Sequence, residues 1–110
     1  MKDITVITIS SDNRSYLGPC LDALQRSNNG FSFDIVVVDN DSKDGSAQFV
    51  KERYPDINLI EGKTRQGFSF NNNLGIKKSD SRYILLLNVD TVIEPGTLKI
   101  MLKFMEMLYY

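Results

Sequence analysis

Four short apolar runs, separated by stretches with helical periodicity, constrain the fold of this chain more than any other feature. The runs are rich in Val, Ile and Leu and nearly continuous in apolar character, which is typical of strands buried on both faces of a parallel sheet. They cover residues 4–9, 35–38, 57–60 and 83–87. The sequence therefore predicts four strands at these positions.

Each run is followed by a stretch in which apolar residues recur at steps of three or four, the spacing of an amphipathic helix. The expected helices cover residues 16–26, 46–54, 68–78 and 95–108, with Pro95 at the first helical position of the last one. This alternation predicts an α/β fold with a mostly parallel four-stranded sheet flanked by helices. A chain of 110 residues has room for one such domain, over residues 1–110.

The expected last helix carries apolar residues on two sides, so it needs cover on two sides. One stripe contains Leu98 and Leu102, and a second contains Ile100, Phe104 and Met107. With a strand order of 3-2-1-4, the fourth strand would also be a hydrophobic edge that recruits another chain. We therefore expect a homodimer formed through the edge strand or the last helix.

Composition excludes several classes of function. The formal net charge of −1 provides no basic field, so no nucleic-acid partner is expected. The chain has no histidine, the commonest general base, and its single cysteine, Cys20, lies in an apolar stretch as a packed thiol. Chemistry would therefore depend on carboxylates and on cations that prefer oxygen ligands.

The expected location is the cytoplasm, with the inner face of the membrane as an alternative. A single cysteine allows no internal disulfide, which fits a reducing compartment. No apolar run approaches the ~20 residues that a membrane-spanning helix needs.

Polar residues follow all four expected strands, and ligands bind beyond the carboxyl ends of strands in open parallel sheets. Asn88 and Asp90 follow the fourth strand, two residues apart on what we expect to be an extended segment, so both side chains would project to one side. Such a pair provides oxygen ligands for a divalent cation that carries a diphosphate. The alternative, that Asp90 only caps the next turn, stays open because Asn-x-Asp is a weak motif.

The ends of the first two strands add further candidates. Ser10 and Asn13 follow the first strand, and Asp39 closes the second. A carboxylate at this position can accept hydrogen bonds from a base or a ribose, or it can bond its own loop. In the order 3-2-1-4, Asp39 and Asp90 would lie two strand spacings apart, roughly 10 Å, which suits a ligand with a base at one end and phosphates at the other.

Four segments in this order resemble the family 2 glycosyltransferases of the GT-A fold. They are residues 4–24, 36–46 (VVVDNDSKDGS), 67–76 (GFSFNNNLGI) and 85–91 (LLLNVDT). The resemblance covers nearly the whole chain and implies a Rossmann-like half domain that binds a nucleotide sugar. The last two segments are most similar to rhamnosyltransferase-type members, which would favour a UDP- or dTDP-sugar.

The resemblance also implies roles for individual residues. Asp39 would recognise the pyrimidine base, and Asn13 and Asn73 would lie near the nucleotide sugar. Residues 88–90 would be the DxD-type motif, with Asp90, helped by Asn88, holding Mn²⁺ or Mg²⁺. The first acid of that motif is Asn88 here, which removes one charge.

The family places its acceptor site and catalytic base further downstream than residue 110. The expected function is transfer of a sugar from a UDP- or dTDP-sugar to a glycan or lipid-linked acceptor, with this chain supplying the donor and metal site. The chain alone would be truncated and inactive, and the alternative is a non-catalytic nucleotide-binding module. A nucleotidyltransferase fits less well because residues 10–15 lack a glycine-rich loop with a basic residue.

Overall fold

The computed structural model, which describes residues 1–27 and 30–108, alternates strands and helices throughout. The four strands form one sheet in the order β3-β2-β1-β4, and every neighbouring pair is parallel. The predicted α/β class and strand order are therefore confirmed. The elements are β1 (Lys2–Ser10), α1 (Arg14–Gln25), β2 (Phe33–Asp39), α2 (Ser46–Arg53), β3 (Asn58–Glu61), α3 (Phe68–Lys78), β4 (Ser81–Leu86) and α4 (Thr97–Leu108).

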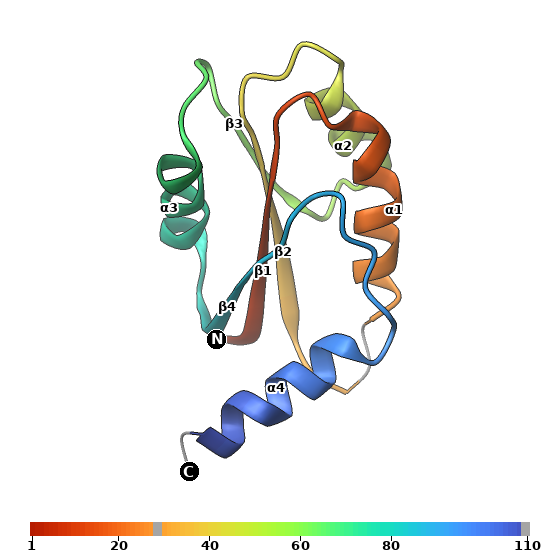
Figure 1. Cartoon of the computed structure of the whole chain (residues 1–110), viewed down its shortest axis with the longest axis vertical. Helices are drawn as coiled ribbons and strands as arrows, with labels where there is room; N and C mark the ends of the chain where they lie inside the picture. The colour runs from red at the N-terminus through yellow and green to blue at the C-terminus, as the bar shows by residue number, and fades with distance from the viewer. Residues whose placement is uncertain (28–29, 109–110) are drawn as a thin grey trace.

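The two faces of the sheet are covered unequally. Helices α1, α2 and α4 contribute side chains to a large core on one face, whereas α3 is the one described helix that packs on the other (Figure 1). The large core includes Leu17, Leu21 and Leu24 of α1 together with Leu98 of α4. The core under α3 has only Ile7, Val36 and Val38 as its fully buried members.

Strand β4 lies at an edge of the sheet and is covered on one face only. Its side chains alternate between half-buried and exposed, and Ile84 and Leu86 are exposed. The second apolar stripe predicted on the last helix is exposed too, since Ile100 and Phe104 keep 69% and 60% of their accessible surface. None of the described helices is long and apolar enough to span a membrane.

The predicted start of the last helix is wrong by two residues. Pro95 and Gly96 form a turn, and α4 begins at Thr97, whose N–H donates to the carbonyl oxygen of Glu94 at 3.1 Å. The segment between β4 and α4 carries the chain from the sheet to the far end of the molecule, where α4 lies (Figure 1).

Candidate functional site

The candidate site lies where β4 stops pairing with its neighbour β1, several residues before β1 itself ends. The last pair between β1 and β4 joins Ile7 to Leu86, but β1 continues to Ser10. After one more contact, from the Leu87 N–H to the Ile7 carbonyl oxygen at 2.9 Å, the chain leaves the sheet. This early end leaves a notch beside the carboxyl half of β1, between α3 and α1.

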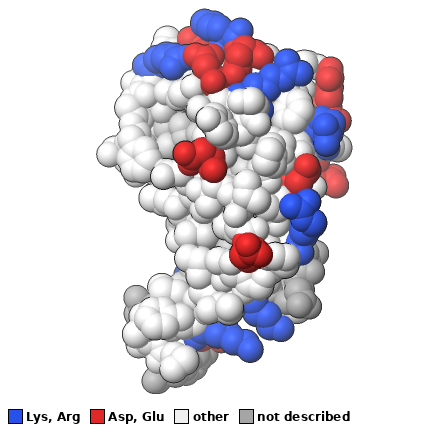
Figure 2. Space-filling view, turned by 45° about the vertical axis from the view of Figure 1, so that its right-hand side comes forward, with Lys and Arg blue, Asp and Glu red and all other residues white. Residues whose placement is uncertain are grey.

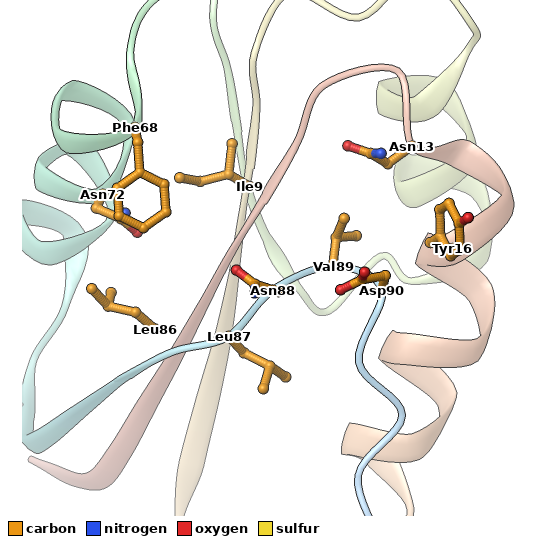
Figure 3. A pocket seen from close by; sticks show the side chains of 10 residues that line it. All are labelled: Ile9, Asn13, Tyr16, Phe68, Asn72, Leu86, Leu87, Asn88, Val89 and Asp90. Carbon is orange, nitrogen blue, oxygen red and sulfur yellow. The ribbon is translucent and has the colours of Figure 1, made fainter.

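A cavity of about 360 Å³ occupies this notch. Its walls come from four parts of the chain: the end of β1, the start of α1, the start of α3 and the segment after β4 (Figure 3). The lining residues are Ile9, Asn13, Tyr16, Phe68, Asn72, Leu86, Leu87, Asn88, Val89 and Asp90. This is the edge of the sheet at which ligands of open α/β folds bind.

The segment that carries Asn88 and Asp90 is a turn and not the extended strand that the sequence predicted. The Thr91 N–H donates to the Asn88 carbonyl oxygen at 3.0 Å, and Val89 is buried in the large core. Because Val89 points inward, Asn88 and Asp90 are both exposed and both line the cavity. The two side chains thus share a site because of this turn and the buried Val89, and not because they alternate along an extended strand.

The first turn of α1 forms the opposite wall. Asn13 precedes the helix, and its Oδ1 accepts a hydrogen bond from the Ser11 N–H at 2.8 Å, while Tyr16 is exposed over the cavity (Figure 3). Burial raises the pKa of the Cys20 thiol to about 11, and the negative charge of Asp90 adds to the increase. Asp90 therefore lies within electrostatic reach of α1, and Cys20 is a packed thiol, as the sequence predicted.

Helix α3 presents Asn72, and not Asn73, to the cavity. Asn71, Asn72 and Gly75 face the sheet and are buried, whereas Asn73 is exposed and lies outside the cavity lining. The close approach depends on Gly75, because a Cβ there would lie 2.6 Å from the Ile7 Cγ2. Three consecutive asparagines therefore have different surroundings.

Asn40 joins three of the loops that follow the strands. Its Nδ2 donates to the Ser11 Oγ at 2.9 Å and to the Gln66 carbonyl oxygen at 3.1 Å, and its Oδ1 accepts from the Gln66 N–H at 2.9 Å. Gln66 comes directly before Gly67 and α3. The side chain of Asn40 thus ties the start of α3 to the loop that precedes α1.

Charged side chains reinforce the same loops from outside. Asp12, in a left-handed conformation with φ of 58°, forms an ion pair with Arg65 and accepts a hydrogen bond from the Lys43 N–H. Figure 2 shows basic and acidic side chains gathered at the top of the molecule, over the loops that follow β1, β2 and β3. The Arg65 guanidinium is therefore already paired with an acid.

Two of the predicted site residues lie beside the cavity without lining it. Ser10 is fully buried, and its hydroxyl donates to the Ser46 Oγ at 3.4 Å. Asp39 is 4% exposed, and its Oδ2 accepts from the Ser42 N–H at 3.2 Å. Within the described residues, the Asp39 Oδ1 is buried without a hydrogen-bond partner.

The oxygen ligands of the cavity fit a hard divalent cation better than a softer metal that prefers nitrogen or sulfur ligands. Asn88 and Asp90 offer an amide and a carboxylate oxygen, which Mg²⁺ and Mn²⁺ accept alongside phosphate oxygens and water. No Lys or Arg lines the cavity among the described residues, so the chain supplies no positive charge there to offset a diphosphate. The described residues also contain no group of three or more Asp, Glu, His or Cys that could hold a metal ion, so substrate oxygens would have to complete the coordination.

Sequence reasoning missed the apolar lining residues and also Tyr16, Phe68 and Asn72, the aromatic and polar ones. Tyr16 and Phe68 are exposed aromatic residues that line the cavity, and no motif in the sequence distinguishes them from other surface aromatic residues. Asn72 carries a usable signal, because it lies three residues before Gly75 and shares its helix face.

Comparison with known proteins agrees with this geometry. The sequence profile of Glycosyl transferase family 2 matches residues 5–109. The chain is 29% identical, over 108 residues, to the minor teichoic acid biosynthesis protein GgaB of Bacillus subtilis (strain 168). That alignment covers 94% of this chain and 12% of GgaB.

Solved structures show the same fold. TarS 1–349 of S. aureus superposes with a TM-score of 0.83 at 25% identity, covering 94% of this chain and 32% of TarS 1–349. Its complexes with UDP and with UDP-GlcNAc give TM-scores of 0.84 and 0.81 at 23% and 24% identity.

The mannosyltransferase PcManGT of Pyrobaculum calidifontis, in complex with GDP-Man and Mn²⁺, gives a TM-score of 0.77 at 22% identity. That superposition covers 89% of this chain and 32% of PcManGT. The predicted GT-A fold is confirmed, and the chain spans less than a third of the length of each of these relatives.

Proposed function

Because this chain belongs to glycosyl transferase family 2, we propose that its cavity binds the nucleotide-sugar donor of a glycosyltransferase. The observation that carries the proposal is the convergence of Asn13, Asn88 and Asp90 on one cavity at the carboxyl edge of the sheet. Asn13 lies 75 positions before Asn88 in the sequence and on the other side of the cavity, and the fold brings the two together. TarS, which binds UDP and UDP-GlcNAc, shares this fold.

Asp90 and Asn88 would hold a divalent cation at the diphosphate. When bound, that cation supplies the positive charge that the lining side chains lack. Asp90 is the single acidic residue among the described lining residues, so its carboxylate is the strongest oxygen ligand in the cavity. PcManGT, a relative in fold, carries Mn²⁺ with its donor.

Asp39 would recognise the base of the donor. Its buried Oδ1 has no hydrogen-bond partner among the described residues, so a base N–H would satisfy an acceptor that the chain leaves free. A pyrimidine presents such an N–H, which supports a UDP- or dTDP-sugar. The unpartnered oxygen distinguishes Asp39 from Asp44, whose carboxylate oxygens accept hydrogen bonds from Arg14 and Ser46.

The reaction would be attack of an acceptor hydroxyl on the anomeric carbon of the donor, with the nucleoside diphosphate as leaving group. The attacking hydroxyl must lose a proton, and no carboxylate other than Asp90 lines the described cavity. The base and the acceptor site would therefore come from outside residues 1–110. A glycan or lipid-linked acceptor is in keeping with GgaB, a protein of minor teichoic acid biosynthesis.

Calorimetric titration of UDP, dTDP and GDP into the purified chain, with and without Mn²⁺, tests this proposal. We expect UDP or dTDP to bind in the presence of Mn²⁺, and Asp90→Ala to abolish the metal-dependent part of binding. Asp56→Ala is the matched control, because Asp56 is an exposed acid that lies outside this cavity.

Metal-dependent binding that Asp90→Ala leaves intact would reject the assigned site. Failure of all three nucleotides to bind would reject the proposed function for this chain. Efficient sugar transfer by the 110 residues alone would contradict the placement of the base outside them.

A further inference from the structure

We propose that the side-chain amide of Asn72 hydrogen-bonds an oxygen of the bound donor and so forms the α3 side of the donor site. The inference rests on the proposed function and adds a contact residue to it. Neither the motif around Asn88 nor the loop around Asn13 identifies this residue. It follows from the surroundings of one asparagine among three consecutive ones.

Asn72 is buried and unpaired at the same time. Only 5% of its surface is exposed, and its Nδ2 has no hydrogen-bond partner among the described residues. Buried amide groups are nearly always paired, so an unpaired one next to a cavity indicates a missing acceptor. Asn72 lines the same cavity as Asn88 and Asp90.

The neighbouring Asn71 differs, because its side-chain amide has hydrogen-bond partners within the protein. Asn71 is equally buried, but its Nδ2 donates to the carbonyl oxygens of Gly67 and Gln66 at 3.1 and 3.3 Å. Asn71 thus fastens the first turn of α3, whereas the Asn72 Nδ2 makes no such hydrogen bond to any described residue. The contrast assigns stability to one asparagine and a ligand contact to the other.

The position of Asn72 is fixed by the packing of its helix. Gly75 lies one turn further along the same face and allows α3 to approach Ile7 closely. At the start of the helix, the Asn40 side chain fastens Gln66. Because it is held at Gln66 and at Gly75, α3 has little freedom to turn Asn72 away from the cavity.

The surroundings of Asn72 favour a hydrogen bond from its uncharged amide beside an apolar surface. Figure 3 shows its amide pointing from α3 toward the strands, beside the Phe68 ring and above Leu86. The amide can turn about χ2, whose energy profile is broad, and so bring its N–H group to a ligand. An oxygen of the diphosphate or a hydroxyl of the sugar is the matching acceptor.

Binding of UDP and of UDP-GlcNAc in the presence of Mn²⁺, measured by calorimetry, tests the proposal with two variants. Asn72→Ala removes the N–H donor and should raise the Kd about 2- to 10-fold, the loss of one hydrogen bond from an uncharged amide. Asn72→Asp keeps the shape but places a negative charge near the diphosphate, and should raise the Kd more. Thermal unfolding of each variant shows that it is folded, and if the alanine variant unfolds, the isosteric aspartate variant carries the test.

The control is Asn58, an exposed amide on β3, the edge strand on the side of the sheet opposite β4. Asn58→Ala and Asn58→Asp should leave both Kd values unchanged. If Asn72→Ala weakens UDP and UDP-GlcNAc equally, the acceptor lies on the nucleoside diphosphate; if it weakens UDP-GlcNAc alone, the acceptor lies on the sugar.

Wild-type binding with an unchanged Kd in both Asn72 variants would overturn the inference and leave the proposed function standing. A larger loss in Asn73→Ala than in Asn72→Ala would overturn it as well. No binding by the wild-type chain would reject the proposed function, and the inference would fail with it.

Discussion

The two faces of the sheet differ in how they are covered, and the difference separates stability from function. On one face, α1, α2 and α4 enclose a core of thirteen buried residues. On the other, α3 alone covers three. The cavity opens where β4 leaves the sheet, between these faces, and its α3 wall carries the exposed ring of Phe68.

This difference has a physical reason. Helix α3 lies over β1 and β2 and leaves that face of β4 open among the described residues, so Ile84 and Leu86 remain exposed there. A binding site needs accessible polar groups, and a well-packed core excludes them. The well-covered face can therefore hold the domain together while the other face gives a ligand access.

The largest expected effect compares two leucines, one on each face. Leu21→Ala should lower the free energy of unfolding by about 2–5 kcal/mol, because Leu21 is fully buried in the large core. Leu74→Ala, on half-buried Leu74 of α3, should cost about half as much or less. Urea unfolding measures both, and equal losses would break the proposed division between the faces.

High pH should lower the free energy of unfolding through two groups in the core of the well-covered face, Cys20 and Tyr54. Above about pH 9 the Cys20 thiol of the unfolded chain loses its proton, but burial raises the pKa of the folded thiol from 9.0 to about 11. The unfolded state then binds fewer protons than the folded state, so stability falls as the pH rises from 9 to 11, by about 2–3 kcal/mol in all.

The control for this effect is Cys20→Ala. In that variant the fall should begin nearer pH 10, where Tyr54 starts to ionise in the unfolded chain, because the pKa of folded Tyr54 is raised to about 12. Urea unfolding at pH 8, 9, 10 and 11 gives the comparison. A stability that does not change between pH 8 and 11 in the wild-type chain would contradict the burial of both groups.

The smallest expected effect compares two helical glycines. Gly75→Ala should lower the free energy of unfolding by about 1–2 kcal/mol, because the new Cβ overlaps Ile7 and helix propensity offsets only part of that cost. Gly18→Ala in α1 meets nothing closer than 3.6 Å and should be neutral or stabilising by up to about 1 kcal/mol. Equal effects in thermal unfolding would show that α3 is free to move off the sheet.

The sequence was sufficient for the architecture because the strands are nearly continuous apolar runs. Residues 35–38, for example, lie at the centre of β2 and are buried. The boundaries were harder, since they depend on contacts made elsewhere. Pro95 has the local properties of a helix start, yet α4 begins at Thr97 after a turn.

The site was predicted in part. Asn13, Asn88 and Asp90 do line one cavity, but the turn at residues 88–91 was not foreseen, because the burial of Val89 in the large core depends on tertiary packing. The sequence also did not show which of Asn72 and Asn73 faces the cavity, because this depends on the rotation of α3 that brings Gly75 onto Ile7. Whether Ser10, Asp39 and Asn73 contact a donor stays a prediction.

The most direct test of this account is an NMR measurement of where the metal–nucleotide complex binds. Mn²⁺ broadens the amide signals of nearby residues, and the chain is 44 Å along its longest axis, so one end can broaden while the other stays sharp. With UDP present and Mg²⁺ as the non-broadening reference, we expect the strongest loss of signal at residues 88–90, with weaker losses at Asn13 and Asn72. Strongest broadening at Arg14, Asp44 and Phe49, which line a separate cavity between α1 and α2, or no localised broadening at all, would contradict the account.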